Sequence, residues 1–469
     1  MSLHLKPEKV FHFFEEMSKI PRTSYNEKQI SDWLVKFGKD RGLETFQDEA
    51  LNVIIKKPGT PGYGDKPAVI IQGHMDMVGE KSADSSHDFE KDPLKLKVKD
   101  NWLYATDTTL GADNGIAVAM GLAVLDTDDL VHPPIELLVT SSEEVGMDGA
   151  AGLDGSLLNG TRLLNIDTEK EGDFITSCAG GNVTKTVFTP KFSDAVKDGY
   201  EIHIHGLIGG HSGLEIIKQR GNAVKLLGRA LKQAGPVLLQ EISGGSKHNA
   251  IPREARAVFV SERLDAEALK DFVEGTLGKE YTEDEVRCDI IPVKTSRLMD
   301  EATSGRIIDY LVVMPDGVQT MMTSMENMVE SSLNSGVLET VDDKVIVTHA
   351  IRSSMGSRKK QLTTAVETLA ELAGGKAEAF SDYPAWEYEP DSRLKDICLK
   401  VYEDSTGKKG VVSGIHAGLE CGLLKEKLPQ TEMISFGPNI EGAHTPEERL
   451  SIDSTERTWN FLVELLKNL

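Results

Sequence analysis

The sequence predicts an α/β protein in which a domain with a mostly parallel sheet is interrupted by an inserted α/β sandwich domain. Short apolar runs, such as residues 68–71, are typical of strands buried on both faces of a sheet. These runs alternate with helix-like segments up to about residue 186, an order that favours a parallel sheet covered by helices. Beyond that point the pattern changes, because alternating segments such as 201–205 indicate half-exposed strands.

This change of pattern divides the chain into three segments. Residues 1–186 are predicted to form the first part of the main domain, 187–383 the inserted domain, and 384–469 the second part of the main domain. The proline-containing stretch 383–390 is predicted to be the linker by which the chain returns. Two crossings between the domains would make a hinge.

The elements of the main domain follow from periodicity and from helix-ending residues. Apolar residues three or four apart, such as Val10, Phe13 and Met17, mark the first helix. Helices are expected at 7–18, 26–41, 116–125, 392–404, after 416 and from 453, with strands at 52–56, 68–72, 135–140, 162–166, near 410 and at 433–435.

The inserted domain shows an order of elements that recurs. Strands are expected at 201–205, 255–260, 286–292, 326–333 and 344–351, and helices at 218–233, 266–277, 303–313 and 357–373. We therefore expect two related halves, although the sequence identity between them is too low to prove a repeat.

Composition excludes several classes of partner. The formal charge of −23 argues against nucleic acid or an anionic membrane as the main partner. No apolar run approaches the roughly 20 residues that a membrane span needs, and charged residues interrupt the N-terminal segment, so no signal peptide is expected. The four cysteines lie far apart in the sequence and are predicted to be reduced core thiols. These observations predict a cytoplasmic protein.

One histidine and four acidic residues follow the predicted buried strands, and a further acid, Asp113, follows a loop and begins a predicted helix. The set comprises His74, Asp76, Asp113, Glu143, Glu144 and Asp167. In an open α/β sheet, the carboxyl ends of the strands meet at one edge, so these side chains are expected to converge there. Several carboxylates in one place repel one another unless a cation neutralises them. A mixed imidazole and carboxylate set suits zinc, manganese or cobalt better than calcium.

Five short motifs carry a resemblance to a known family. They are Gly73-His-Met-Asp76, Leu110-Gly-Ala-Asp-Asn-Gly115, Ser142-Glu-Glu-Val-Gly146, Ile166-Asp167 and Gly442-Ala-His-Thr-Pro446. Together they resemble the two-metal superfamily of zinc dipeptidases, aminoacylases and carboxypeptidases. Three further segments resemble the bacterial aminoacyl-histidine dipeptidases, which are carnosinase-like: Gly209-Gly-His-Ser-Gly213, His248-Asn-Ala-Ile-Pro252 and His416-Ala-Gly-Leu-Glu-Cys-Gly422. The resemblance covers nearly the whole chain in order.

The resemblance implies a role for each residue of the metal centre. It implies two divalent metal ions, with zinc favoured and cobalt or manganese as alternatives. The implied ligands are His74, Asp113 as the bridge, Asp167, Glu144 and His444. Glu143 would be the general base and Asp76 would orient His74. A cis peptide bond is expected between Asp113 and Asn114. Two alternatives stay open: an exchange of roles between Glu143 and Glu144, and His416 as a ligand in place of His444.

The inserted domain is implied to be a lid that binds substrate. His211 is the implied donor to the oxyanion of the reaction. Arg352 could clamp the substrate carboxylate, and Asn249, the Gly414 backbone and His416 are further candidate contacts. The alternatives are a polar turn residue for His211 and an ordinary ion pair for Arg352.

The resulting hypothesis is hydrolysis of unblocked dipeptides, with histidine preferred at the second position. A dipeptidase of broader specificity and an N-acyl amino acid deacylase are alternatives within the superfamily, and a non-catalytic binding protein is the alternative outside enzymes. The expected partner is a small dipeptide, and a homodimer through the inserted domain is a further expectation, with His211 acting within one chain or across the dimer. The pair His203 and His205 is expected to be solvent-facing or packed, and Glu447 and Glu448 to be solvated surface charge.

Overall fold

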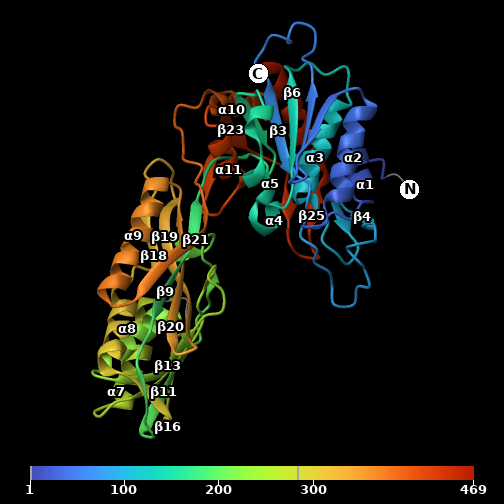
Figure 1. Cartoon of the computed structure of the whole chain (residues 1–469). Helices are drawn as coiled ribbons and strands as arrows, with labels where there is room; N and C mark the ends of the chain where they lie inside the picture. The colour runs from blue at the N-terminus through green and yellow to red at the C-terminus, as the bar shows by residue number, and fades with distance from the viewer. Residues whose placement is uncertain (1–2, 282–284) are drawn as a thin grey trace. The chain divides into compact units, whose positions relative to one another are not determined.

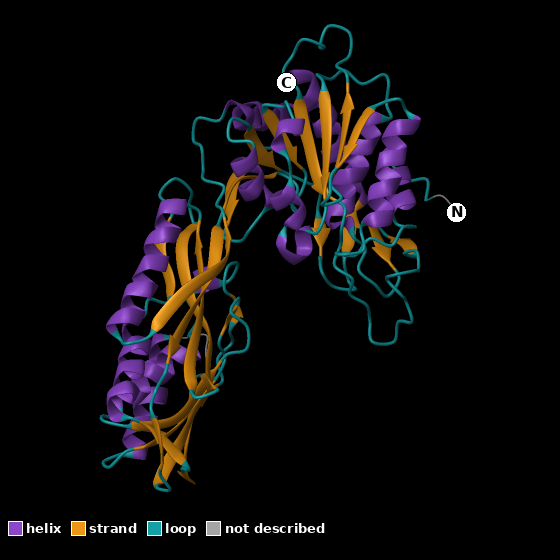
Figure 2. Cartoon of the chain, viewed as in Figure 1, coloured by secondary structure: helices purple, strands orange, loops and turns teal. Residues whose placement is uncertain are grey.

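The computed structural model describes residues 3–281 and 285–469, and the chain divides into two compact units (Figure 1). Unit 1 comprises Met1–Ser177, Tyr388–Gly414 and Leu419–Leu469, and unit 2 comprises Cys178–Glu387 and Ile415–Gly418. Each unit combines a sheet with helices, as Figure 2 shows. The prediction of an α/β fold class is confirmed.

The main sheet of unit 1 is parallel in its centre and antiparallel at its sides. Its strand order among the described residues is β1-β2-β6-β3-β7-β23-β8-β22. Strands β6, β3, β7 and β23 pair in parallel, whereas β1, β2 and β8 join antiparallel. The bounds are β1 Glu44–Gln47, β2 Val53–Lys57, β3 Val69–His74, β6 Ile135–Thr140, β7 Arg162–Asn165, β8 Asp173–Cys178, β22 Val411–Ile415 and β23 Glu432–Ser435.

The helices of unit 1 pack on this sheet around one core. Their bounds are α1 Glu8–Met17, α2 Lys28–Asp40, α3 Ala112–Leu125, α4 Glu143–Gly146, α5 Asp148–Gly152, α10 Arg393–Thr406, α11 Glu420–Lys427 and α12 Ile452–Asn468, with a 3₁₀ turn η1 at Gly155–Leu157. A smaller sheet orders β24 (Ile440–Glu441), β25 (Arg449–Ser451), β5 (Trp102–Ala105) and β4 (Leu96–Lys99). Each predicted helix of the main domain is present to within a few residues.

Helix α3 lies unusually close to the sheet because small residues face each other across the contact. A Cβ added at Gly73 of β3 would lie 2.6 Å from the Cβ of Ala117, and one at Gly121 would lie 2.3 Å from Leu137 of β6. Nearly all of α3 is buried. This close packing fixes the start of α3 against the end of β3, where the candidate site lies.

Unit 2 is built on one continuous sheet. Its strand order among the described residues is β16-β11-β15-β13-β19-β20-β9-β21, with β18 paired to β19. The bounds are β9 Gly180–Phe188, β11 Asp198–His205, β13 Leu238–Gly244, β15 Ala255–Val260, β16 Arg287–Lys294, β18 Gly317–Met321, β19 Val329–Val341, β20 Lys344–Ser353 and β21 Lys376–Tyr383. The two predicted halves therefore share a single sheet.

Helices α7, α8 and α9 lie on one side of this sheet (Figure 1). The helical segments of the unit are α6 Ala223–Gln233, α7 Ala266–Asp271, α8 Glu301–Val313 and α9 Gly356–Leu372, with shorter turns η2 Ile216–Lys218, η3 Phe272–Leu277 and η4 Gly278–Glu280. Two small ribbons pair β10 (Phe192–Asp194) with β17 (Arg297–Met299) and β12 (Gly210–His211) with β14 (Ala250–Ile251).

Two boundaries predicted for unit 2 are wrong for physical reasons. The helix expected at 218–233 begins at Ala223, because the Asn222 side chain caps it by accepting N–H bonds from Val224 and Lys225. The strand expected at 326–333 runs instead over Val329–Val341, where a bulge between Ser335 and Val337 interrupts the apolar alternation.

The remaining sequence expectations concern cysteines and membranes. All four cysteines are buried and remain thiols. Within residues 3–281 and 285–469, no helix combines the length and apolar character that crossing a membrane requires.

Candidate functional site

The predicted metal ligands and Glu143 all lie in unit 1, and most of them stand at or just beyond the ends of its central strands. His74 is the last residue of β3, and Asp167 follows β7. Glu143 and Glu144 open α4 after β6, and Asp113 is the second residue of α3. His444 lies in the loop between β24 and β25 with a φ of 62°. The carboxyl edge of the parallel centre thus gathers the set, as the strand arrangement predicts.

Asp113 lies between two imidazoles. Its Oδ1 is 3.2 Å from Nε2 of His74, and its Oδ2 is 3.3 Å from Nε2 of His444. The two oxygens of one carboxylate therefore face two separate nitrogen donors. This is the geometry that a bridging carboxylate needs.

The other acids divide between the two imidazoles. On one side, Asp167 Oδ1 lies 3.7 Å and Glu143 Oε2 lies 4.0 Å from Nε2 of His74. On the other side, Glu144 lies 3.0 Å from Nε2 of His444. Ligand atoms of His74, Asp113 and Glu144 lie within 4.8 Å of one another. These donor types at these separations fit borderline divalent metals such as zinc.

Burial and mutual repulsion dominate the electrostatics of the cluster. Burial, reinforced by nearby carboxylates, raises the pKa of Glu143 to about 8 and raises that of Asp167 well above its usual value. Hydrogen bonds to Asp113 and Glu144 raise the pKa of His444 to about 11. The cluster therefore favours positive charge at its centre, which is the property of a cation site.

Asp76 holds both His74 and the two glutamates. Its Oδ1 lies 3.3 Å from Nδ1 of His74 and accepts the backbone N–H of Glu143 at 3.0 Å. Its Oδ2 accepts the N–H of Glu144 at 3.2 Å and the hydroxyl of Ser24 at 2.8 Å. Burial alone would raise the pKa of Asp76, but these bonds and the His74 imidazole hold it below its usual value. One carboxylate thus orients three of the site residues.

Glu448 contradicts the expectation that it is solvated surface charge. Its side chain is 2% exposed, and its carboxylate accepts the backbone N–H groups of Leu110, Gly111, Ala112 and Asp113 at 2.7, 2.9, 2.8 and 3.2 Å. A carboxylate is stable there because a helix begins with unpaired N–H groups. Glu448 therefore fixes the loop that carries Asp113.

Arg22 supports the same loop from another direction. It is fully buried and donates to the carbonyls of Met75, Asp76 and Gly111 at 2.9, 3.3 and 2.6 Å. Burial lowers its pKa to about 10, so it stays charged at neutral pH. Arg22 ties the His74–Asp76 segment to the start of α3. Nothing in the sequence around Arg22 points to this role.

The buried side chains of Asn114 and Glu420 make two more contacts near the metal ligands that the sequence analysis did not predict. The peptide bond between Asp113 and Asn114 is cis, as the family resemblance implies, and the Asn114 side chain bonds the His74 N–H and the Ile166 carbonyl. Glu420 is fully buried and accepts hydrogen bonds from Gln72 and Thr140 at 2.6 and 2.7 Å. Burial raises the pKa of Glu420 to about 7. The one sequence feature that could have pointed to Glu420 is its position in the segment His416–Gly422, which carries the family resemblance.

Unit 2 holds most of the predicted substrate contacts. His211 lies on β12, and its Nδ1 accepts backbone N–H groups of Gly213 at 3.2 Å and Leu214 at 3.1 Å. Because Nδ1 is an acceptor, the ring proton resides on Nε2. Burial and the neighbouring Arg352 lower the pKa of His211, which keeps the ring neutral. His211 therefore presents one N–H donor.

Arg352 and His416 lie beside His211 around Gly213. A Cβ on Gly213 would lie 2.5 Å from the His416 carbonyl, 3.1 Å from His211 Cε1 and 3.2 Å from Arg352 Nε. Arg352 donates to the Tyr383 hydroxyl at 2.7 Å, and its buried Nε finds no partner among the described residues. Nε2 of His416 pairs with the Ser332 hydroxyl at 2.7 Å. Only glycine fits where these three groups converge.

The last two predicted contacts are placed differently. Asn249 adjoins the His211 loop through its backbone carbonyl, which accepts the N–H of Ser212 at 2.9 Å. Gly414 lies in β22 and belongs to unit 1, whereas the following residues Ile415–Gly418, which carry His416, belong to unit 2. His211, Arg352 and His416 are thus gathered in one unit and the predicted metal ligands in the other.

Comparisons with known proteins agree with this arrangement. The model of peptidase family M20/M25/M40 matches residues 70–468. The cytosol non-specific dipeptidase of Escherichia coli is 37% identical over 99% of this chain and 98% of its own length. The structure of an aminoacylhistidine dipeptidase from Vibrio alginolyticus matches with a TM-score of 0.90 and 38% identity, covering 100% of this chain and 98% of that one. An aminopeptidase PepT from Bacillus cereus shares the fold, with a TM-score of 0.57 and 15% identity over 99% and 98% of the two chains.

Replacing Glu448 tests its support of the Asp113 loop. Glu448→Gln puts an amide N–H₂ against backbone N–H groups that need an acceptor, so the free energy of unfolding should fall by about 3 kcal/mol. Metal affinity should fall by about 10- to 100-fold, as for other residues that orient ligands. The neighbouring Glu447 is exposed, and Glu447→Gln is the matched control. Equal stability and metal affinity for the two variants would contradict the role of Glu448.

Proposed function

Since the chain belongs to peptidase family M20/M25/M40, we propose that it is a two-metal dipeptidase that hydrolyses unblocked dipeptides. The observation that carries this proposal is the position of Asp113, whose two oxygens face His74 and His444 at 3.2 and 3.3 Å. A single metal site has no use for a carboxylate shared in this way. Two adjoining sites require one.

Each metal site draws on its own side of the Asp113 carboxylate. His74 and Asp167 would complete the first site, and Glu144 and His444 the second. When bound, the two ions lower the pKa of a water molecule toward neutral and polarise the scissile carbonyl. We propose zinc, with cobalt or manganese as alternatives, because the donors are imidazoles and carboxylates.

Glu143 is the proposed general base. Glu144 contacts His444, whereas Glu143 points toward His74 at the longer distance of 4.0 Å, which supports one ligand and one base. The pKa of Glu143 at about 8 is that of a group able to take a proton near neutral pH. Glu143 would remove a proton from the attacking water and deliver it to the leaving amine. These contacts favour Glu143 as the base and Glu144 as the ligand over the opposite assignment.

The proposed ligand is His444 and not its rival His416. His444 contacts Asp113 and Glu144, while His416 contacts Ser332 of unit 2. Burial and the nearby Arg352 lower the pKa of His416 to about 3, so its ring is neutral and suited to binding substrate.

We propose that unit 2 is the substrate-binding domain predicted for the insertion. His211, with its proton on Nε2, would donate to the oxyanion of the reaction. Arg352 would bind the carboxylate of the dipeptide, because its buried Nε keeps an unused N–H. Asn249 and the Gly414 backbone are proposed as further contacts. The proposal includes two routes for His211, which would act either within its own chain or across a homodimer.

The preference for histidine at the second position is the finer proposal, supported by the similarity to the aminoacylhistidine dipeptidase of Vibrio alginolyticus. The name of the Escherichia coli relative, a cytosol non-specific dipeptidase, favours broad dipeptide specificity as the second candidate and supports a cytoplasmic location. Deacylation of N-acyl amino acids is the alternative reaction that the same site would support.

Removing the base should separate binding from turnover. Glu143→Gln should retain the metal content of the wild type and lower kcat by about 10³-fold, because the water loses its proton acceptor. Metal content and kcat would be measured on the same preparations, with the exposed Asp148→Asn as control. Wild-type turnover in Glu143→Gln would remove Glu143 from the mechanism.

A substrate panel separates the three specificities. For matched pairs such as Ala-His and Ala-Ala, kcat/KM should be higher for the histidine peptide by at least about 10-fold. N-acetyl-histidine should not be cleaved, since the proposal requires a free amine. Equal values across free dipeptides would favour the broad dipeptidase, and faster cleavage of N-acetylated substrates would favour the deacylase.

A further inference from the structure

Unit 2 carries a second group of metal-ligating side chains, outside the residues of the proposed peptidase site. It consists of His203 and His205 on β11 and Asp289 on β16, with Glu254 just before β15. We propose that these residues bind one divalent transition-metal ion of the zinc class. The proposal does not depend on the peptidase function, because none of these residues belongs to the proposed reaction.

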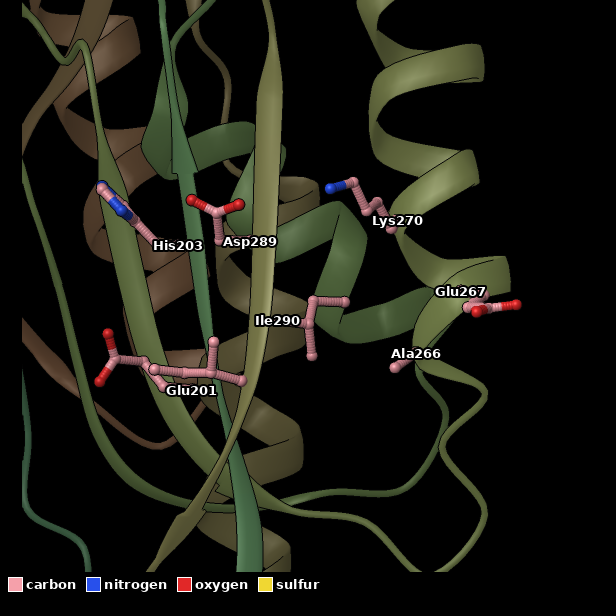
Figure 3. Close-up of a pocket in the computed structure, with 8 residues that line it drawn as sticks. Glu201, His203, Ala266, Glu267, Lys270, Asp289 and Ile290 are labelled. Carbon is pink, nitrogen blue, oxygen red and sulfur yellow. The ribbon is translucent and has the colours of Figure 1, made fainter.

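Strand geometry brings the three primary ligands to one face of the sheet. Ile202 and Ile204 of β11 are fully buried in the core, so the alternating His203 and His205 project from the opposite face. Asp289 stands directly across from His203 in the antiparallel pairing of β11 and β16. Figure 3 shows His203 and Asp289 on their neighbouring strands. The His-x-His spacing on β11 thus supplies two imidazoles, and the neighbouring strand β16 supplies a carboxylate.

The distances place the donor atoms within reach of one ion. His205 Nε2 lies 3.0 Å from Asp289 Oδ2, and the two imidazole rings stack with centroids 4.5 Å apart. One ligand atom each of His203, His205 and Asp289 lies within 4.8 Å of the others. Around a tetrahedral zinc, whose bonds are about 2.1 Å long, ligand atoms lie about 3.4 Å apart. Small side-chain rotations therefore suffice.

The side chains are free to make those rotations. Their exposed fractions are 20% for His203, 34% for His205 and 62% for Asp289. Glu254 lies on the other side, with its carboxylate 2.8 Å from Nε2 of His203, and can supply a fourth ligand. The donor set is then two imidazoles and two carboxylates, which zinc, copper and nickel accept.

Two of the nearby cations have acidic partners outside the proposed site. Arg287 pairs with Glu285 at 3.6 Å, and Lys270 pairs with Glu274 at 3.8 Å. Arg256, which stands across from His203 in the pairing of β11 and β15, lies 3.6 Å from Glu254 and shares this proposed ligand. Asp289 and the two histidines are therefore the three principal ligands of the proposed site. His203 and Asp289 also line a hollow of about 370 Å³, together with Lys270 of α7, which leaves access from solvent (Figure 3).

A bound ion would connect an edge strand of the sheet, β16, to the interior strand β11. β16 is the last strand in the order of the sheet and pairs only with β11 among the described strands. An ion held by β11 and β16 would tie this edge strand to its neighbour. We therefore expect the ion to raise the unfolding temperature of the protein, because a ligand that binds only the folded state stabilises it.

The test measures zinc bound to the full-length chain at buffered free Zn²⁺, by equilibrium dialysis and elemental analysis. The wild type should bind one zinc ion more per chain than the variant His203→Ala/His205→Ala. The control Glu201→Gln removes an acid from the same strand and face and should bind as the wild type does. Asp289→Asn should weaken the additional site by at least about 10-fold. Zinc should also raise the unfolding temperature more in the wild type than in the double variant.

A second measurement identifies the ligands directly. With Cu²⁺ added to the zinc-saturated protein, the difference spectrum between wild type and double variant should show electron paramagnetic resonance splitting from two imidazole nitrogens. His205→Gln, a milder change on the exposed face, should lose one of the two nitrogens. Equal zinc content in wild type and double variant, or a loss equally large in Glu201→Gln, would overturn the proposal. Dipeptide hydrolysis should be unchanged in the double variant.

Discussion

The candidate site depends on one carboxylate, that of Asp113, being held between two imidazoles. A carboxylate in that position repels the other acids around it, so it must be fixed by groups that cannot move away. The backbone loop before it is fixed by Glu448, which accepts four consecutive N–H groups, and by Arg22, which binds the Gly111 carbonyl. Small residues between α3 and β3 hold the helix start against His74. Packing, backbone hydrogen bonds and charge thus all help to hold the Asp113 side chain in place.

The same constraint explains why Asp76 is so fully engaged. It lies under His74 and accepts the N–H groups of both Glu143 and Glu144, so a shift in any of these positions would disturb the others. Two glutamates adjacent in sequence then face different partners, Glu143 toward His74 and Glu144 toward His444. A division of labour between a base and a ligand is natural in this geometry.

Much of this arrangement was predictable from the sequence. Polar residues that follow buried strands identified His74, Glu143, Glu144 and Asp167, because parallel strands bring their carboxyl ends to one edge, and the predicted helix start after a loop added Asp113. Glu448 and Arg22 were not predictable, since their partners are backbone groups 335 and 89 residues away along the chain. Such contacts leave no periodic or compositional trace. The helix predicted at 218–233 was wrong because a cap at Asn222 sets its start more strongly than helix propensity does.

The most direct test of the central claim is the metal content of chains altered at Asp113. In a His203→Ala/His205→Ala background, which removes the proposed additional site, the otherwise unaltered chain should retain two metal ions after dialysis. His444→Ala should retain one ion, because only the second site loses a ligand, whereas Asp113→Ala should retain fewer than one, because both sites lose their shared carboxylate. Two ions retained by Asp113→Ala, or a single ion in the background chain, would contradict a bridging Asp113.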